Sequence, residues 1–286
     1  MKLISKKGKA LSLMILIGIS TIQISKAQTV EAKLGWKLGA QTWTFKNFSF
    51  MQALDKIDSC QLKYVEAYPK QLIGGEIAGT VDYHMDKSKR QQLLSVLKSK
   101  GIKWVSYGVI TPDNDADWIA LFEFAKEMGL ENITSEPKMK DLPMVSKLCD
   151  KYKINIAIHN HPKPSIYWSP DTLLNHIKGL SNRVGACADL GHWVRSGLDP
   201  VTCLQKLQGH IIQLHFKDLN EKSATAHDVH WGTGVDNIPT VIAELKRQHF
   251  KGVISAEYEY NWAGNSADVA ASVQNLRVLL NKPIIQ

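Results

Sequence analysis

Residues 154–161 (INIAIHNH) and 184–192 (VGACADLGH) share one pattern, a short apolar run that ends in imidazole or carboxylate side chains. A run of four to seven apolar or β-branched residues is typical of a buried parallel strand. Further runs of this kind occur between residues 38 and 257, and longer segments with apolar residues three and four positions apart separate them. This alternation predicts a parallel sheet that is covered by helices.

Eight strands are expected, at residues 38–42, 64–67, 104–109, 132–135, 154–160, 184–189, 211–216 and 253–257. Eight strand–helix pairs in a chain of this length, with 44% apolar residues, predict a single (β/α)₈ TIM barrel over residues 28–286. A doubly wound open sheet is the alternative fold. It is disfavoured because no Gly-x-Gly-x-x-Gly motif follows the first strand.

Residues 1–27 have the pattern of a secretory signal peptide. Lysines precede an apolar run from Ala10 to Ile24, and the segment ends in Ser25-Lys26-Ala27. The run is short for a helix that crosses a bilayer, and an uncleaved anchor is the alternative. We expect cleavage after Ala27 and an exported, periplasmic or secreted protein with no stable membrane insertion.

The charge of the chain limits the class of partner that it can bind, and the cysteine spacing indicates the state of the thiols. The formal net charge of +8 includes five lysines before Gln28, which leaves +3 for the exported chain, spread without a basic run. Such a chain lacks the electrostatic signature of nucleic-acid or anionic-membrane binding, so small molecules are favoured. The four cysteines show no metal-binding spacing and are expected to be mostly buried free thiols, with one disulfide as the alternative.

Polar side chains follow each of the last five expected strands, where a barrel carries its functional groups. They are Glu136, then His159 and His161, then Asp189 and His192, then His215 and Lys217, and finally Glu257 and Glu259. Acidic and imidazole groups that share one mouth repel or stay unpaired unless a cation neutralises them. Two glutamates, one aspartate and one histidine would suit Mn²⁺, Mg²⁺, Co²⁺ or Zn²⁺. No serine or cysteine nucleophile motif competes with this interpretation.

At these residues the chain resembles the xylose isomerase-like superfamily of sugar isomerases and epimerases, over about residues 38–280. The resemblance implies one divalent ion, with Mn²⁺ favoured, held by Glu136, Asp189, His215 and Glu257. Glu259 is the alternative for the last ligand. In the ketose epimerases of this superfamily the two ligand glutamates form the acid/base pair, which here implies Glu136 and Glu257.

Substrate contacts are expected around this metal. The family's Asp-x-x-His element matches Asp189 to His192, which implies that His192 contacts a substrate oxygen, with a purely structural role as the alternative. Lys217 stands near the position of an arginine in the epimerases, so it either contacts substrate or forms a salt bridge with Asp218 or Glu259. The further expected contacts are His159, Glu66, Trp43 and His230.

Together these expectations describe a metal-dependent sugar isomerase or epimerase that transfers a proton next to a carbonyl through an enediolate. A lyase or dehydratase that acts on keto-sugars or 3-keto-glycosides by the same enolisation is the alternative reaction. A non-catalytic sugar-binding protein is the alternative of another class. The sequence leaves open the oligomeric state, a homo-oligomer included, and whether a dehydrogenase partner supplies a keto substrate.

Overall fold

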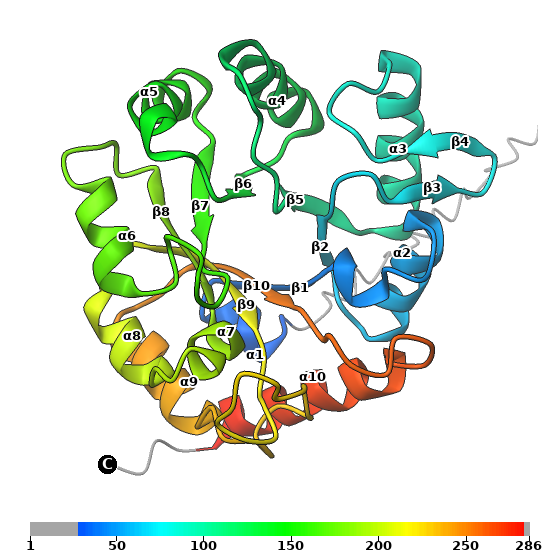
Figure 1. Ribbon diagram of the computed structural model, residues 1–286. Helices are drawn as coiled ribbons and strands as arrows, with labels where there is room; N and C mark the ends of the chain where they lie inside the picture. Colours follow the sequence, from blue (N-terminus) through cyan, green and yellow to red (C-terminus); the bar gives the residue numbers. More distant parts are fainter. Residues whose placement is uncertain (1–27, 283–286) are drawn as a thin grey trace, which may run out of the picture.

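Eight parallel strands close a barrel. The computed structural model describes residues 28–282, so the signal peptide expected at 1–27 lies outside the described residues. The strands follow one another around the barrel in the order β1-β10-β9-β8-β7-β6-β5-β2, and β2 pairs with β1 (Figure 1). Their bounds are β1 (Trp36–Gln41), β2 (Tyr64–Ala67), β5 (Lys103–Tyr107), β6 (Asn132–Ser135), β7 (Asn155–His159), β8 (Val184–Asp189), β9 (Ile211–Phe216) and β10 (Gly252–Ala256). The expected single (β/α)₈ barrel is confirmed.

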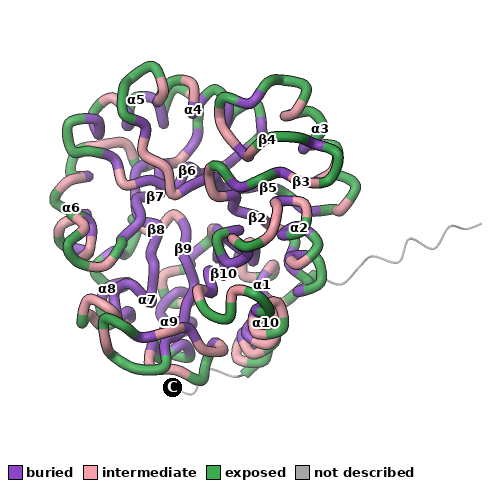
Figure 2. Tube along the Cα trace, turned by 45° about the vertical axis from the view of Figure 1, so that its right-hand side comes forward, coloured by how far each residue is buried: buried purple, intermediate pink, exposed green. Residues whose placement is uncertain are grey.

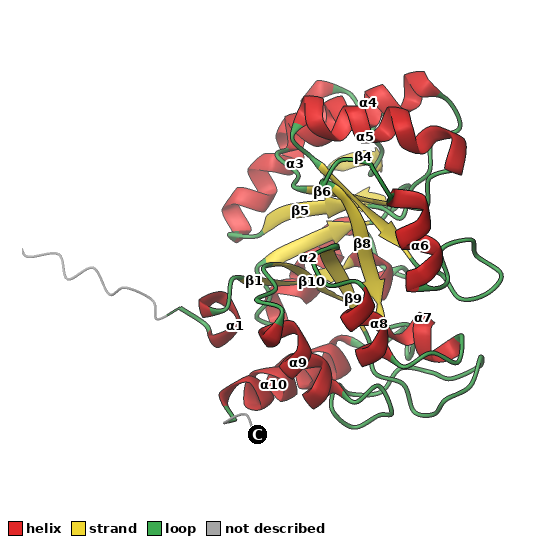
Figure 3. Cartoon of the chain, turned by 90° about the vertical axis from the view of Figure 1, so that its left-hand side faces the viewer, coloured by secondary structure: helices red, strands yellow, loops and turns green. Residues whose placement is uncertain are grey.

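A helix follows each barrel strand and packs outside the barrel. These helices are α2 (Phe50–Ser59), α3 (Lys87–Lys100), α4 (Asp115–Met128), α5 (Leu142–Tyr152), α6 (Pro170–Ile177), α8 (Pro200–Lys206), α9 (Ile238–Arg247) and α10 (Ser266–Asn281). Two short helices mark the ends of the barrel. The helix α1 (Val30–Lys33) lies where the chain enters β1, and α7 (Leu190–Arg195) follows β8 at the opposite end (Figure 3).

Capping residues explain where several helices begin and end. Ser49 accepts a hydrogen bond from the backbone N–H of Gln52, and the Gln52 side chain accepts one from Ser49, which forms a capping box for α2. Gly101 and Gly129 end α3 and α4 in the left-handed conformation, with φ of 62° and 71°. Residue types that favour helix ends therefore set the bounds of these three helices.

All eight expected strands are present, and β2, β6, β8 and β9 have the expected bounds. The bounds of the other four differ by at most two residues. One antiparallel hairpin was not expected, β3 (Leu72–Gly74) with β4 (Ile77–Thr80), between β2 and α3. Its strands are too short to show an apolar period, and its turn relies on positive φ at Gly74 and Gly75.

Buried side chains concentrate on the strands and on the inward faces of the helices (Figure 2). The interior of the barrel also holds a buried polar network, in contrast to the apolar contacts outside it. The carboxylate of Glu66 accepts hydrogen bonds from Thr134, Gln213 and Ser255, on strands β6, β9 and β10. Because each of these polar side chains has a hydrogen-bond partner, the network stabilises one arrangement of the strands directly beneath their carboxyl ends.

A long loop connects β9 to α9 and folds back on itself. The carboxylate of Asp218 accepts hydrogen bonds from the backbone N–H groups of Gly232, Gly234 and Asp236. Leu219 in turn donates its N–H to Asp236. These bonds tie the far end of the loop to the end of β9.

Two expectations about the whole chain can be compared with residues 28–282. All four cysteines are buried free thiols, as expected. Within this range no helix combines the length and apolar character that a bilayer span requires.

Candidate functional site

Four buried side chains converge at the carboxyl ends of neighbouring strands. His159 ends β7, Asp189 ends β8, His215 lies near the end of β9, and Glu257 follows β10. Each offers one nitrogen or oxygen atom, and these four atoms lie within 4.8 Å of one another. The pairing of β7 with β8, β8 with β9, and β9 with β10 places the four residues side by side.

The four inward-facing atoms form no well-directed hydrogen bond among the described residues, and their close contacts are with one another and with the Lys217 ammonium group. They are His159 Nε2, Asp189 Oδ2, His215 Nδ1 and Glu257 Oε2. Buried polar atoms without directed hydrogen bonds cost free energy, and a cation bound among these four close donor atoms would supply the missing interactions. Two imidazole nitrogens and two carboxylate oxygens fit a transition-metal ion such as Zn²⁺, Mn²⁺ or Co²⁺ and leave room for substrate oxygens.

A second carboxylate orients His215. Its Nε2 lies 3.1 Å from both carboxylate oxygens of Glu66, so Nε2–H donates to Glu66, while Nδ1 faces Glu257 Oε2 at 3.0 Å. Burial raises the pKa of Glu66, but His215 and the hydroxyl donors outweigh it and lower the pKa below its usual value. A histidine held by a buried carboxylate in this way is a typical metal ligand. Glu66 is fully buried and does not line the pocket, so the structure places it behind His215 and away from the expected substrate contact.

Lys217 is also buried beneath the pocket. Its ammonium group lies 3.4 Å from Asp189 Oδ2 and 3.0 Å from Glu257 Oε2, and it pairs with Glu259. Burial lowers the pKa of Lys217, but these carboxylates outweigh it and hold the pKa well above its usual value. Lys217 thus remains charged and takes the salt-bridge alternative with Glu259, and it is absent from the pocket lining.

Glu136 does not join the four converging residues. Its Oε1 accepts hydrogen bonds from the backbone N–H of His161 at 3.0 Å and from His161 Nδ1 at 2.6 Å, and lies 3.2 Å from His159 Nδ1. Its Oε2 accepts from the Ser165 hydroxyl at 2.9 Å. Burial raises the pKa of Glu136, but these imidazoles outweigh it and hold the pKa far below its usual value. The geometry therefore places His159, not Glu136, beside Asp189.

The position of Glu136 outside the four converging residues has a local cause. The strand β6 ends at Ser135, and Pro137 follows Glu136 directly. Glu136 thus lies outside the strand, where the pleat no longer fixes the direction of its side chain. His159 is the last residue of β7 and keeps its strand geometry.

A pocket of about 390 Å³ opens above the converging residues. Of the expected substrate-binding residues, Trp43, His159 and His192 line it, whereas Glu66, Lys217 and His230 do not. The His230 ring bonds instead to Asp268 at 3.0 Å. The full lining is Gln41, Trp43, Tyr68, Pro69, Val109, His159, His161, His192, Glu257 and Glu259.

Aromatic side chains form one wall of this pocket. The ring of Trp43 is 38% exposed and packs edge-on against Tyr68, with ring centroids 5.1 Å apart. Trp262 also packs edge-on against Trp43, with ring centroids 6.5 Å apart. An exposed indole beside polar groups suits the apolar face of a sugar ring. Trp193, in contrast, is buried and does not line the pocket.

Strand periodicity also marks Gln213, a residue of the buried network that was not among the expected site residues. In β9 the polar residues Gln213 and His215 alternate with Leu214 and Phe216, and Lys217 continues the alternation. Side chains two apart lie on the same face of a strand, so this face points into the barrel. The same period places His159 on the inner face of β7.

A closed parallel barrel with imidazoles and carboxylates at its carboxyl face defines the class of (β/α)₈ barrels whose function resides at the ends of the strands. Residues 139–280 match the family described as xylose isomerase-like TIM barrel. The chain belongs to this family, as the sequence resemblance implied. No curated protein sequence matches the chain.

Solved structures share the fold over most of the chain. An uncharacterized protein from Parabacteroides distasonis ATCC 8503 is 36% identical, with a TM-score of 0.71 over 85% of this chain and 98% of that one. A D-tagatose 3-epimerase-like protein is 19% identical, with a TM-score of 0.68 over 85% and 97%. The IOLI protein with a bound zinc atom is 16% identical, with a TM-score of 0.67 over 85% and 97%.

Proposed function

We propose that the chain is a metal-dependent isomerase or epimerase of a sugar or keto-sugar. The observation that carries this proposal is the group of four buried donor atoms at the floor of a pocket with an aromatic wall. A divalent ion held there would polarise the substrate carbonyl and stabilise the negative charge of an enediolate. Mn²⁺ remains the favoured ion, beside Zn²⁺ and Co²⁺, because two imidazole ligands suit Mg²⁺ poorly.

The metal ligands would be His159, Asp189, His215 and Glu257. His159 and His215 each have a carboxylate behind the ring, Glu136 and Glu66 respectively, and such carboxylates orient a ring and raise its basicity.

Two groups of the pocket can move protons at the substrate. Glu257 lines the pocket directly. Glu136 is hydrogen-bonded on both oxygens, so it acts through His161, whose ring is half-exposed and lines the pocket. A proton removed by one group and returned by the other to the opposite face of the same carbon gives an epimer. A proton returned to the neighbouring carbon gives an isomer.

The test begins with incubation of the purified, Mn²⁺-loaded protein with ketoses, aldoses and 3-keto-glycosides in D₂O. The Mn²⁺ is then removed, and NMR spectra of the sugars are recorded. The variants are Glu257→Gln and His161→Asn. The matched control is His210→Asn, which alters an exposed histidine just before β9, at the end of the barrel remote from the pocket. We expect deuterium next to the carbonyl with an intact carbon skeleton in the wild type and the control, and its loss in both other variants.

Other outcomes identify the alternatives. Release of water or of an aglycone with a new unsaturated ketone would make the protein a lyase. Tight sugar binding without exchange in any substrate would make it a sugar-binding protein and overturn the enzyme proposal.

We also propose that the protein is exported, on the pattern of residues 1–27. Mass spectrometry of protein recovered from the periplasm or the medium should find Gln28 at the amino terminus. Intact residues 1–27 in a membrane fraction would support the uncleaved anchor. A partner dehydrogenase remains a proposal that follows from a keto substrate.

A further inference from the structure

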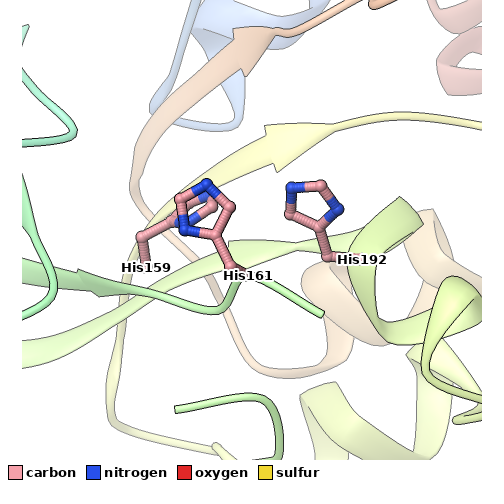
Figure 4. Close-up of side chains that lie close together, drawn as sticks. All are labelled: His159, His161 and His192. Carbon is pink, nitrogen blue, oxygen red and sulfur yellow. The ribbon is translucent and has the colours of Figure 1, made fainter. Parts of the chain in front are cut away.

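Three imidazoles lie together at the pocket. His159 and His161 come from the end of β7, and His192 comes from α7 (Figure 4). Each has a ring nitrogen within 4.8 Å of the other two. Because a neutral imidazole has one N–H and one lone pair, its function depends on which nitrogen carries the proton. The charged group that contacts Nδ1 of each ring determines which nitrogen carries the proton, and this group is an anion for two rings and a cation for the third.

A carboxylate lies behind His159 and His161. An ionised carboxylate only accepts hydrogen bonds. The Nδ1 atom of His161 lies 2.6 Å from Glu136 Oε1, a distance at which two lone pairs would repel, so this Nδ1 carries a proton. In its neutral form the His161 ring therefore keeps a lone pair on Nε2.

A guanidinium lies behind His192. Arg195 Nη1 is 3.2 Å from His192 Nδ1, and a guanidinium only donates hydrogen bonds. His192 Nδ1 must then be the acceptor, so the proton of this ring is on Nε2. His192 thus has the opposite polarity to His161.

Arg195 is well held in this position. Its Nη1 also donates to Glu259 at 3.1 Å, its Nε donates to the carbonyl of Ala226 at 3.2 Å, and its Nη2 lies 3.4 Å from Asp228 Oδ2. The side chain is only 12% exposed. With these partners, the guanidinium has little freedom to leave His192.

We propose that Arg195 is a positioning residue that makes His192 a hydrogen-bond donor, so that His161 and His192 recognise a hydroxyl and a carbonyl oxygen on the same substrate. The lone pair of His161 Nε2 accepts from the hydroxyl, and His192 Nε2–H donates to the carbonyl. This pair selects an α-hydroxycarbonyl compound. The inference rests on the proposed function for the identity of the substrate, but the protonation pattern does not depend on it. It also keeps His192 out of the metal shell, because its Nε2 has no free lone pair.

The test is the histidine side-chain ¹H–¹⁵N correlation spectrum of protein labelled with ¹⁵N-histidine, with and without Zn²⁺, a diamagnetic ion. His161→Asn and His192→Gln assign the two rings. We expect a protonated, pyrrole-type Nε2 in His192 and a protonated Nδ1 in His161, in the absence of any substrate. A lone pair on His192 Nε2, or a His192 nitrogen that shifts as a zinc ligand, would overturn the inference.

Two variants distinguish the effect of Arg195 on His192 from the effect of the residues around it. Arg195→Met removes the donor to His192 and should shift its proton toward Nδ1 or a mixture of both forms. Asp228→Asn keeps Arg195 and its contact with His192, and should leave the spectrum of His192 unchanged. A spectrum of His192 that is the same in Arg195→Met as in the wild type would contradict the positioning role.

The kinetic counterpart is a loss in kcat of about 100-fold for Arg195→Met, the usual cost of one donor directed at a developing oxyanion. KM should change little. If the protein has no isomerase activity, the proposed function fails while the spectrum still tests the inference. If exchange occurs but His192 has a free Nε2 lone pair, the inference fails alone.

Discussion

Replacing His159 by leucine is expected to abolish metal binding, whereas Glu136→Gln should only weaken it. His159 Nε2 is one of the four converging donor atoms, and leucine fills similar space without a ligand atom. Glu136 lies behind the ring, where its Oε1 accepts from Nδ1. A glutamine keeps this acceptor but not its charge, and loss of such a partner reduces metal affinity by about 10-fold to 100-fold.

The size of the effect on thermal stability follows from mass action. At a metal concentration of 100 times Kd, binding stabilises the wild type by about 2.7 kcal/mol. For a domain of this size that corresponds to a rise in Tm of about 5–11 °C. A 10-fold weaker Kd in Glu136→Gln leaves about 1.4 kcal/mol, or a rise of about 3–6 °C at the same concentration. His159→Leu should show no rise.

The assay is calorimetric unfolding of each chelator-treated protein with increasing Mn²⁺ or Zn²⁺, together with titration calorimetry for Kd. His210→Asn serves as the control, because this exposed residue lies outside the pocket lining. A full Tm rise in His159→Leu and none in Glu136→Gln would refute the geometry and restore Glu136 as the ligand.

Three further predictions concern the support of the metal, the pocket wall and the loop after β9. Glu66→Gln should weaken metal binding by about 10-fold or more, because the ring of His215 loses its charged acceptor; an unchanged Kd in titration calorimetry would contradict this. Trp43→Ala should raise the Kd for a sugar by roughly fivefold, the equivalent of about 1 kcal/mol of aromatic contact, and an unaltered Kd would remove the stacking role. Burial and the charge of Asp218 raise the pKa of Asp236 to about 8, whereas the unfolded chain releases this proton near pH 4. The contribution of the protonated Asp236 carboxyl to the free energy of unfolding is therefore complete below about pH 4 and falls as the pH rises toward 8. Asp236→Asn should therefore reduce the loss in Tm between pH 6 and pH 9. Equal losses in both proteins would show that Asp236 is not responsible.

Local patterns were sufficient for the fold. Each barrel strand combines a short apolar run with a following helix whose ends are marked by Ser, Asp, Pro or Gly, and these signals act within a few residues of the chain. The hairpin β3–β4 escaped prediction because its strands are short and depend on a glycine turn. Function at the carboxyl ends of the strands followed from the barrel itself.

Part of the candidate site could be predicted from the sequence. Asp189, His215 and Glu257 could be chosen from sequence because each lies at or next to the end of a strand. The choice between Glu136 and His159 could not, since both follow neighbouring strands and both can ligate a metal. The roles of Glu66 and Lys217 were also out of reach, because both side chains are buried among groups far apart in the chain.

By itself the sequence determined that this protein is a (β/α)₈ barrel with acidic and imidazole groups around one mouth. Only the tertiary structure decided which of these groups face one another, and which lie behind as supports. The physical reason is that a side chain's direction depends on strand pleat and register, and its protonation depends on its hydrogen-bond partner. Glu136 and Arg195 show this most clearly, because each acts through a histidine that it holds by Nδ1.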